Sequence, residues 1–150
     1  MTSKINLFFS EFDDIEIRRA VPQFKIIRLM VNIAFREKDG QTRFYPAIID
    51  TGSHLSLIPK SIWERCSVHK IKETRVAGLS SKEESFLPVT IGTIECIIAG
   101  EENFLVEKEI YAYLSADDEN PILLGFWDLL QFCRASFDYQ KKEAFLEWEE

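Results

Sequence analysis

Cysteine and histidine are scarce in this sequence, and those present are widely spaced. Cys66, Cys96 and Cys133 form no Cys-x-x-Cys pair and are accompanied by only 2 histidines. A structural zinc site needs closely spaced ligands of these types, so no metal is expected. An odd number of cysteines without a regular framework is typical of a reducing compartment rather than of a secreted, disulfide-bonded protein. We expect all three to be small buried hydrophobic side chains.

Long hydrophobic runs are absent as well. Residues 5–9 are apolar, but Glu11, Asp13 and Asp14 follow at once, which is wrong for a secretory signal peptide. No apolar run approaches the roughly 20 residues that a membrane-spanning helix needs. The sequence therefore predicts a soluble, cytoplasmic protein without a membrane partner.

Positive charge is in deficit. The chain of 150 residues has 18 Lys+Arg against 25 Asp+Glu, which gives a formal net charge of -7. Such a field repels a phosphate backbone, so nucleic acid is not an expected partner. Repeats, linkers and low-complexity segments are absent too, and 46% of the residues are hydrophobic. We expect residues 1–150 to form one domain with a sizeable core.

The sequence does contain a series of short apolar segments that are rich in β-branched residues and separated by turns. Strands are predicted at 26–35, 43–49, 71–77, 89–98, 104–114, 121–125, 135–139 and 144–148. Asp39-Gly40 predicts a hairpin turn between the first two. Gly92 interrupts one segment and predicts either a bulge or a second turn.

Few segments favour a helix. Ile15, Ile17 and Val21 suggest a short alternating strand, which Pro22 ends or places at a sheet edge. Short helices are expected only at 59–65 and 126–132. Short strands with frequent turns favour an all-β, barrel-like domain.

The stretch 45–59 places a carboxylate at the end of an apolar run. A carboxylate in that position is costly unless it is hydrogen-bonded or takes part in chemistry. Gly52 permits backbone angles that other residues resist, while Thr51 and Ser53 supply hydroxyl groups for neighbouring backbone or carboxylate atoms. We therefore expect the chemistry of this protein at Asp50.

A second polar segment, residues 78–85, lies between apolar arms and predicts an extended hairpin with a solvated tip. Gly78 at its shoulder lets the hairpin bend or move. The acidic cluster Asp117-Asp118-Glu119 lacks the spacing of a calcium loop, so we interpret it as a solvated loop.

The segment Ala47–Ser53 resembles the catalytic loop of the retropepsin-like aspartic peptidases, in which two apolar residues precede Asp-Thr-Gly. Ile122–Gly125 is similar to the strand that packs beside this loop in the family. Residues 78–85 fall where the family carries its flap. Ser136–Tyr139 looks like the end of the family's domain, particularly in stand-alone bacterial members. The resemblance extends over residues 26–139.

The chain also differs from the retroviral members of the family. Ser53 stands where they usually have alanine, and Phe126-Trp127-Asp128 lacks their Arg-Asn/Asp signature. The segment 78–85 contains one glycine, whereas many flaps are glycine-rich. These differences concern the dimer interface and the flap rather than the catalytic loop.

The resemblance implies an all-β fold, a closed acid-protease barrel with a flap hairpin, and hydrolysis of peptide bonds in an extended polypeptide substrate. The implied catalytic residues are Asp50, Thr51 and Gly52, and no cofactor is implied. The implied substrate-binding residues are Ser53, Gly78, Leu79, Ser80 and Ser81.

Hydrolysis by carboxylates needs two of them around one water, one ionised and one protonated. The chain has a single Asp-Thr-Gly, and its other aspartates lie in polar loops or a predicted helix. We therefore hypothesise a two-fold homodimer in which Asp50 meets its own copy, because an isologous interface brings a residue near itself.

Simpler interpretations stay open at this point. Asp-Thr-Gly is also compatible with a plain turn, because Asp bonds its own backbone and Gly is a common turn residue. Leu123-Leu124-Gly125 is compatible with an ordinary strand end. The alternative function is a non-catalytic retropepsin-like module that dimerises or holds peptides, since a shared fold does not guarantee activity.

Overall fold

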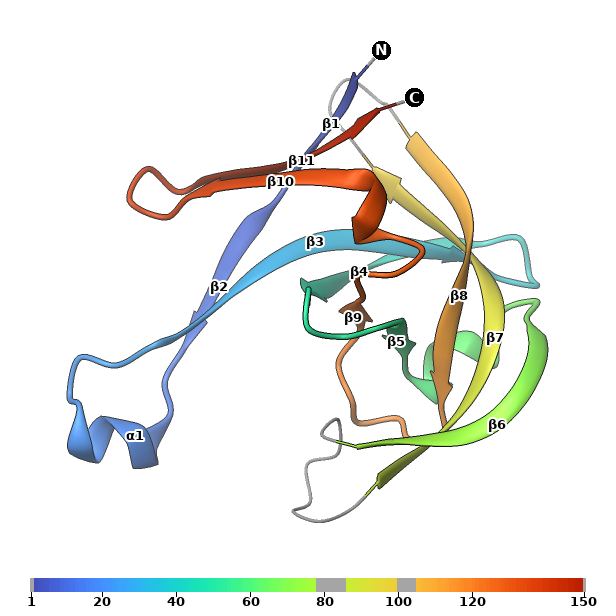
Figure 1. Cartoon of the computed structure of the whole chain (residues 1–150), viewed down its shortest axis with the longest axis horizontal. Coiled ribbons are helices and arrows are strands. Elements are labelled where there is room, and N and C mark those ends of the chain that lie inside the picture. The colour runs from blue at the N-terminus through green and yellow to red at the C-terminus, as the bar shows by residue number, and fades with distance from the viewer. Residues whose placement is uncertain (1, 78–85, 100–104, 150) are drawn as a thin grey trace.

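The computed structural model describes residues 2–77, 86–99 and 105–149, which Figure 1 shows as helices, strands and connecting loops. In chain order the elements are β1 (Thr2–Asn6), β2 (Phe8–Phe12), α1 (Ile15–Ala20), β3 (Ile26–Arg36), β4 (Thr42–Ile49), β5 (Ser56–Ile58), α2 (Lys60–Trp63), β6 (His69–Ala77), β7 (Phe86–Ala99), β8 (Leu105–Ser115), β9 (Leu123–Leu124), η2 (Leu130–Phe132), β10 (Cys133–Asp138) and β11 (Glu143–Glu149).

Six of these strands close into a barrel. Hydrogen-bonded pairing among the described residues runs through β3, β4, β9, β5, β8 and β7 and then returns to β3. The pairs β4–β9 and β5–β8 are parallel, and the others are antiparallel. Ile33 opposite Ile98 and Phe35 opposite Cys96 close the ring. The predicted all-β barrel is therefore confirmed, with the predicted hairpin between β3 and β4.

Side chains from every strand of the ring fill the barrel. The buried set includes Ile33, Phe35, Ala47, Ile58, Ile94, Ile98, Ile110, Leu114 and Leu124. Burial of each large member contributes roughly 1.5–3 kcal/mol to the free energy of folding. This core holds in place the ends of β4, β5 and β9, which carry the candidate site.

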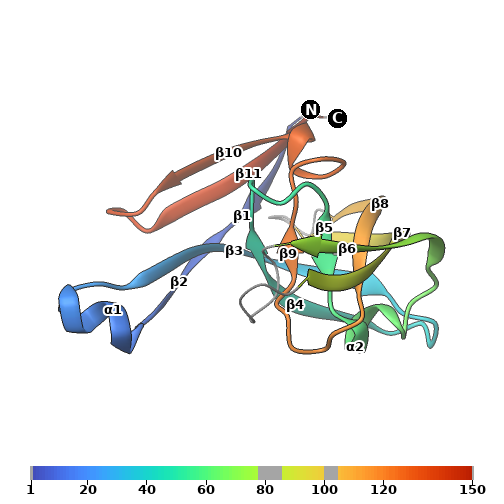
Figure 2. The same cartoon turned by 60° about the horizontal axis from the view of Figure 1, so that its bottom comes forward.

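The two ends of the chain meet in a second sheet, with the strand order β1–β11–β10. The predicted pairing of 135–139 with 144–148 is confirmed, with Ala135 opposite Leu146. Ile5 of β1 opposes Leu146 from the other side, and both are fully buried. Figure 1 and Figure 2 show the N- and C-termini next to each other at this sheet.

The N-terminal segment corrects one prediction. Ile15–Ala20 form the helix α1 rather than a strand, and Asp14 caps this helix by accepting a hydrogen bond from the Ile17 amide at 3.1 Å. Alternation of Ile15 and Ile17 is too short a pattern to outweigh a capping aspartate, which satisfies an amide that otherwise has no partner in the helix.

The predicted helix at 126–132 is wrong for most of its length. Asp128 has a left-handed backbone (φ 70°), which an α-helix of L-residues does not tolerate, and only Leu130–Phe132 form a 3-10 turn. The helix predicted at 59–65 is confirmed as α2, with Pro59 at its N-cap position. None of the helices in the described ranges is long and apolar enough to cross a membrane.

Gly92 marks a bulge rather than a second turn. β7 runs through it without interruption, and the register slips in the facing strand between Lys70 and Lys72. A Cβ atom on Gly92 would lie 2.6 Å from the His69 carbonyl oxygen, so the bulge needs glycine at this position.

Candidate active site

The end of β4 positions Asp50 beside β9. The Ile48 amide donates to the Ile122 carbonyl at 2.9 Å, and the Asp50 amide donates to the Leu124 carbonyl at 3.0 Å. Ile48, near the end of β4, and the candidate catalytic residue Asp50 are thus fixed by a parallel ladder whose other strand is buried. This ladder explains why the two segments singled out in the sequence, 47–53 and 122–125, lie side by side.

The turn after β4 holds the Asp50 carboxylate at a half-buried position. The Gly52 amide donates to Asp50 Oδ1 at 3.0 Å, and the Ser53 amide donates to the Asp50 carbonyl at 3.2 Å. Asp50 Oδ2 has no hydrogen-bond partner among the described residues of the protomer. Thr51 and Gly52 are exposed at the tip of the turn. The arrangement presents one free carboxylate oxygen beside an exposed tip.

Gly52 corrects an expectation about backbone freedom. Among the described glycines only Gly40 has a positive φ, so Gly52 does not use the left-handed region. A Cβ atom at Gly52 would lie 3.4 Å from Asp50 Oδ1, which is an ordinary van der Waals contact. The structural contribution of Gly52 is its amide, which reaches the carboxylate.

Ser53 is buried, and its hydroxyl donates to the Leu55 carbonyl at 2.6 Å. A hydroxyl group has one proton to donate, so of the two expected acceptors, backbone or carboxylate, Ser53 uses the backbone. In the protomer Ser53 stabilises the path of the chain from the turn into β5. Its predicted role in substrate binding stays a prediction.

The strand end at Gly125 packs directly under the turn. A Cβ atom on Gly125 would lie 2.3 Å from the Leu55 carbonyl carbon and 2.5 Å from its oxygen, so no other residue fits there without a backbone shift. The Gly125 amide donates to Ser56 Oγ at 3.0 Å, and Ser56 is buried. Sequence reasoning missed Ser56, although a single serine in the apolar run Leu55–Ile58 is the signal that identifies it.

The residues after Gly125 continue the support of the turn. The Phe126 amide donates to the Ser53 carbonyl at 2.8 Å, and the Trp127 amide donates to the His54 carbonyl at 2.9 Å. Both side chains are about half exposed. The segment that differs from the retroviral signature therefore still braces the candidate catalytic turn through its backbone.

Asp128 is the aspartate nearest in sequence to this support, but both its oxygens are engaged. Oδ2 accepts a hydrogen bond from the Tyr111 amide at 2.8 Å, and Oδ1 lies 3.3 Å from Lys108 Nζ. The Asp128 carboxylate thus accepts the backbone amide of Tyr111, which lies on β8 just before the residues that pair with β5. Asp128 is therefore a structural residue rather than a second catalytic carboxylate.

An apolar cluster connects the turn to the predicted flap hairpin. Its buried members are Leu57 of β5, Leu123 of β9, and Leu87 and Val89 of β7. The strands β6 and β7 are paired as far as Ala77 and Phe86, which confirms the arms of the hairpin. The predicted substrate-binding residues Gly78, Leu79, Ser80 and Ser81 lie outside the described residues.

A cavity of about 390 Å³ opens elsewhere, between α2 and the hairpin strands. Trp63, Glu73 and Thr90 are among its lining residues, and none of residues 50–53 belongs to it. It is separate from the candidate active site. No group of three or more potential metal ligands occurs within the described part of the chain.

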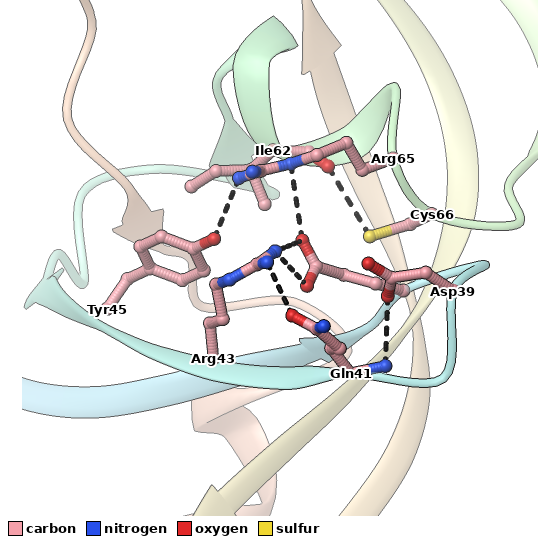
Figure 3. A network of polar contacts seen from close by, with 8 residues as sticks. Asp39, Gln41, Arg43, Tyr45, Ile62, Arg65 and Cys66 are labelled. Carbon is pink, nitrogen blue, oxygen red and sulfur yellow. Dashed lines mark hydrogen bonds and ion pairs between the residues drawn. The ribbon is translucent and has the colours of Figure 1, made fainter.

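A charged cluster that the sequence did not predict joins the β3–β4 turn to the turn after α2 (Figure 3). Glu37 is buried, and its carboxylate accepts two hydrogen bonds from Arg43 Nη1, at 2.9 and 2.7 Å. Arg65 Nε lies 3.2 Å from the same carboxylate, and Arg65 Nη2 donates to the Tyr45 hydroxyl at 2.8 Å. Every charge in this cluster is paired, so we assign it to stability of the fold rather than to catalysis.

Comparison with known proteins supports the fold. No family model matches the sequence, and no curated protein resembles it closely enough to count as a relative. A solved structure of a retropepsin-like aspartic protease from Rickettsia conorii is similar to this chain, with a TM-score of 0.51 and 15% sequence identity. The match covers 99% of this chain and 94% of that one. The two proteins therefore share a retropepsin-like fold over nearly their whole lengths.

Proposed function

We propose that this protein is an aspartic endopeptidase that hydrolyses peptide bonds as a homodimer. The observation that carries the proposal is the Asp50 carboxylate, which is held at the end of a barrel strand with one oxygen bound to the Gly52 amide. Its other oxygen has no partner among the described residues of the protomer. The retropepsin-like fold supports the same assignment by analogy.

The proposed chemistry uses two carboxyl groups around one water. Two carboxylates a few ångströms apart cannot both ionise cheaply, so they share a proton and titrate as a pair. The ionised group takes a proton from the water, and the protonated group polarises the carbonyl of the scissile bond. The Gly52 amide donates to one oxygen of Asp50, and Thr51 is proposed to lock the turns of the two copies together by hydroxyl-to-backbone hydrogen bonds.

The second carboxylate comes from Asp50 of another copy of the chain. Asp128 is engaged by Tyr111 and Lys108, and among residues 2–77, 86–99 and 105–149 Asp50 is the aspartate whose amide bonds to β9, which supports this proposal. A two-fold axis through the turn brings Asp50 close to its own copy without any further element.

An extended polypeptide is the proposed substrate, bound by strand addition under the hairpin of β6 and β7. We propose that alternate substrate side chains pack beside the cluster formed by Leu57, Leu87, Val89 and Leu123, which joins β5 and β9 to the hairpin strand β7. Ser53 and the hairpin residues Gly78, Leu79, Ser80 and Ser81 are proposed to contact substrate. We also propose a cytoplasmic location, which the three free cysteines support.

Cleavage of a denatured protein at mildly acid pH, with and without a statyl-type inhibitor, tests the assignment. Asp50→Asn keeps the fold but removes the ionisable group, so we expect a loss of at least about 100-fold in rate. Asp118→Asn is the matched control, because Asp118 is exposed and has no hydrogen bond or ion pair among the described residues. Near wild-type cleavage by Asp50→Asn contradicts the proposal. Peptide binding without turnover at any pH favours the non-catalytic module instead.

A further inference from the structure

The segment from Phe8 to Leu29, here called the arm, contains no buried residue. It consists of β2, α1 and the first residues of β3. Its large apolar side chains that are exposed are Phe8, Phe12, Ile15, Ile17, Val21 and Ile27. Exposed fractions range from 39% to 73%, the highest at Ile15. Phe8 and Phe12 lie on one face of the β2–β3 pair and Ile27 lies on the other, so apolar surface is exposed on both faces of the arm. Exposed apolar surface of this extent marks an interaction site.

The arm extends past the Asp50 turn. The pairing of β3 with β4 ends at Met30 opposite Ile48, two residues before Asp50. β3 begins at Ile26, so its first four residues continue about 14 Å beyond that last pair, and α1 lies further out. Figure 1 and Figure 2 show the arm projecting from the barrel on the side where the loop between β4 and β5 lies.

The direction of the arm is fixed within the protomer. Lys142, in the turn between β10 and β11, lies 3.3 Å from the Glu11 carboxylate, and the rings of Phe9 and Tyr139 pack edge to face at 5.2 Å. These contacts brace the middle of β2. They leave α1 beyond the braced point, and all six of its residues are exposed. A helix of this length has little stability of its own in water, so its order needs other contacts.

We propose that the arm packs against a second copy of this chain, across the two-fold axis that pairs the Asp50 turns. This inference rests on the proposed homodimer. An element that extends beyond a two-fold axis lies on the surface of the other subunit, and the same contact is made in return. In this dimer the arm of each subunit packs against the other subunit, and this contact covers α1.

The charges of the arm suit contact with its own copy. Acidic residues come first along the arm and basic residues follow. The acidic ones are Glu11, Asp13, Asp14 and Glu16, and the basic ones are Arg18, Arg19, Lys25 and Arg28. Four of each sign leave the arm neutral within a chain of net charge -7. Inside the protomer Asp13 pairs with Arg18, and Glu11 pairs with Lys142. The charges of the arm that form no ion pair among the described residues are Asp14, Glu16, Arg19, Lys25 and Arg28. An isologous contact can therefore place the acidic part of one arm near the basic part of the other, in a molecule whose copies otherwise repel.

The exposed apolar area of the arm is also comparable with the area that one side of a dimer interface buries. With roughly 200 Å² for a large side chain, the exposed parts of the six apolar residues amount to about 550 Å², divided between the two faces of the β2–β3 pair and α1. A standard interface buries about 800 Å² on each side. The arm thus supplies most of the surface that a stable dimer needs, and the exposed catalytic turn supplies more.

Sedimentation velocity on the purified chain over a range of concentrations tests the proposal. The variant Ile15→Glu/Ile17→Glu places charge on the exposed face of α1, where it does not disturb the barrel. We expect it to raise the dimer dissociation constant at least tenfold. Ile71→Glu is the control, because Ile71 is similarly exposed on β6 but lies outside the arm. Circular dichroism checks that all three proteins keep the same strand content and melting temperature.

The outcomes separate this inference from the proposed activity. If Ile15→Glu/Ile17→Glu weakens the wild-type dimer and Ile71→Glu does not, the proposed contact between the arm and the second copy is supported. This holds whether or not the protein cleaves peptides. If the dimer is equally stable in both variants, the proposed contact of the arm is wrong, and the peptidase proposal is unaffected. A wild-type protein that stays monomeric at 100 times the concentration used in activity assays overturns both the arm contact and the proposed homodimer.

Discussion

At Gly125 the absence of a side chain decides whether the candidate active site can form. The backbone of Leu55 passes where a Cβ atom would stand, so the turn after β4 and the end of β9 can approach only with glycine in this place. The sequence pattern predicted Gly125 as the end of an apolar-apolar-Gly strand. The reason it is needed, a close backbone approach from Leu55, depends on a contact between distant segments.

Gly125→Ala is expected to lower the free energy of unfolding by about 3 kcal/mol, because the added methyl group forces a backbone shift. Urea unfolding followed by tryptophan fluorescence measures the change. Gly52→Ala is the control: its Cβ atom meets nothing closer than 3.4 Å, so a change within about 1 kcal/mol is expected. Equal effects of the two substitutions would contradict the packing described at Gly125.

Ser56 is the residue that sequence reasoning overlooked, and its hydroxyl accepts the Gly125 amide. Ser56→Ala leaves that buried amide without a partner, and we expect a loss of about 1–3 kcal/mol in unfolding free energy. Ser136→Ala on β10 is the control, since no hydrogen bond of its hydroxyl occurs among the described residues. A Ser56→Ala protein as stable as wild type would show that the amide finds another acceptor.

The cysteines confirm part of the sequence analysis. Cys66 and Cys96 are buried as expected, whereas Cys133 is half-buried. Burial raises the pKa of the Cys66 thiol to about 11 and the pKa values of Cys96 and Cys133 to about 12. At pH 8, below all these pKa values, the three thiols are protonated and unreactive.

Iodoacetamide at pH 8 is therefore expected to modify the folded protein at least about 100-fold more slowly than a free thiol of pKa 9, because thiolate is the reactive form. In guanidinium chloride the pKa values return to their usual range and all three should react quickly. Mass spectrometry counts the modified sites. Rapid modification of any cysteine in the folded protein would contradict its placement.

At the scale of elements, Glu37 ties the β3–β4 turn to β4 through Arg43 and to the turn after α2 through Arg65 (Figure 3). Both guanidinium groups are partly exposed, so water can solvate them if the carboxylate is removed. The contribution of the cluster is therefore smaller than that of a fully buried ion pair. It still fixes the turn from which β4 runs to Asp50.

Glu37→Ala is expected to destabilise the protein by about 2 kcal/mol, and Arg43→Ala by less, because Arg65 still pairs with Glu37. Chemical unfolding of both single variants and the double variant gives the coupling energy. Asp13→Ala, which removes the exposed pair with Arg18, serves as a control with an expected change under about 0.5 kcal/mol. Additive effects of Glu37→Ala and Arg43→Ala would show that the two residues are not coupled.

Elements whose signals are local could be predicted, and those decided by distant contacts could not. The β3–β4 hairpin follows from Asp39-Gly40 between apolar arms, and β10 and β11 from a similar local pattern. The helix predicted at 126–132 failed because Asp128 turns its backbone to bond the Tyr111 amide on β8. The helix α1 was missed although Asp14 carries a local capping signal.

At the scale of the whole molecule, one barrel supplies half of the proposed catalytic site, and its arm extends past the Asp50 turn. The sequence predicted the barrel and the position of Asp50 from motif order. It did not predict the arm, because the lack of buried residues between Phe8 and Leu29 is a property of the folded chain.

Subunit mixing tests the central claim, that Asp50 of two copies forms one catalytic dyad. Wild-type protein at a fixed concentration is equilibrated with increasing amounts of inactive Asp50→Asn protein, and peptide cleavage is followed. If the dyad is shared, wild-type chains are drawn into heterodimers with one ionisable aspartate, and activity falls towards zero with excess variant. The same excess of a double variant, Asp50→Asn with Ile15→Glu/Ile17→Glu, should inhibit much less. Activity that stays constant as Asp50→Asn protein is added would contradict the account.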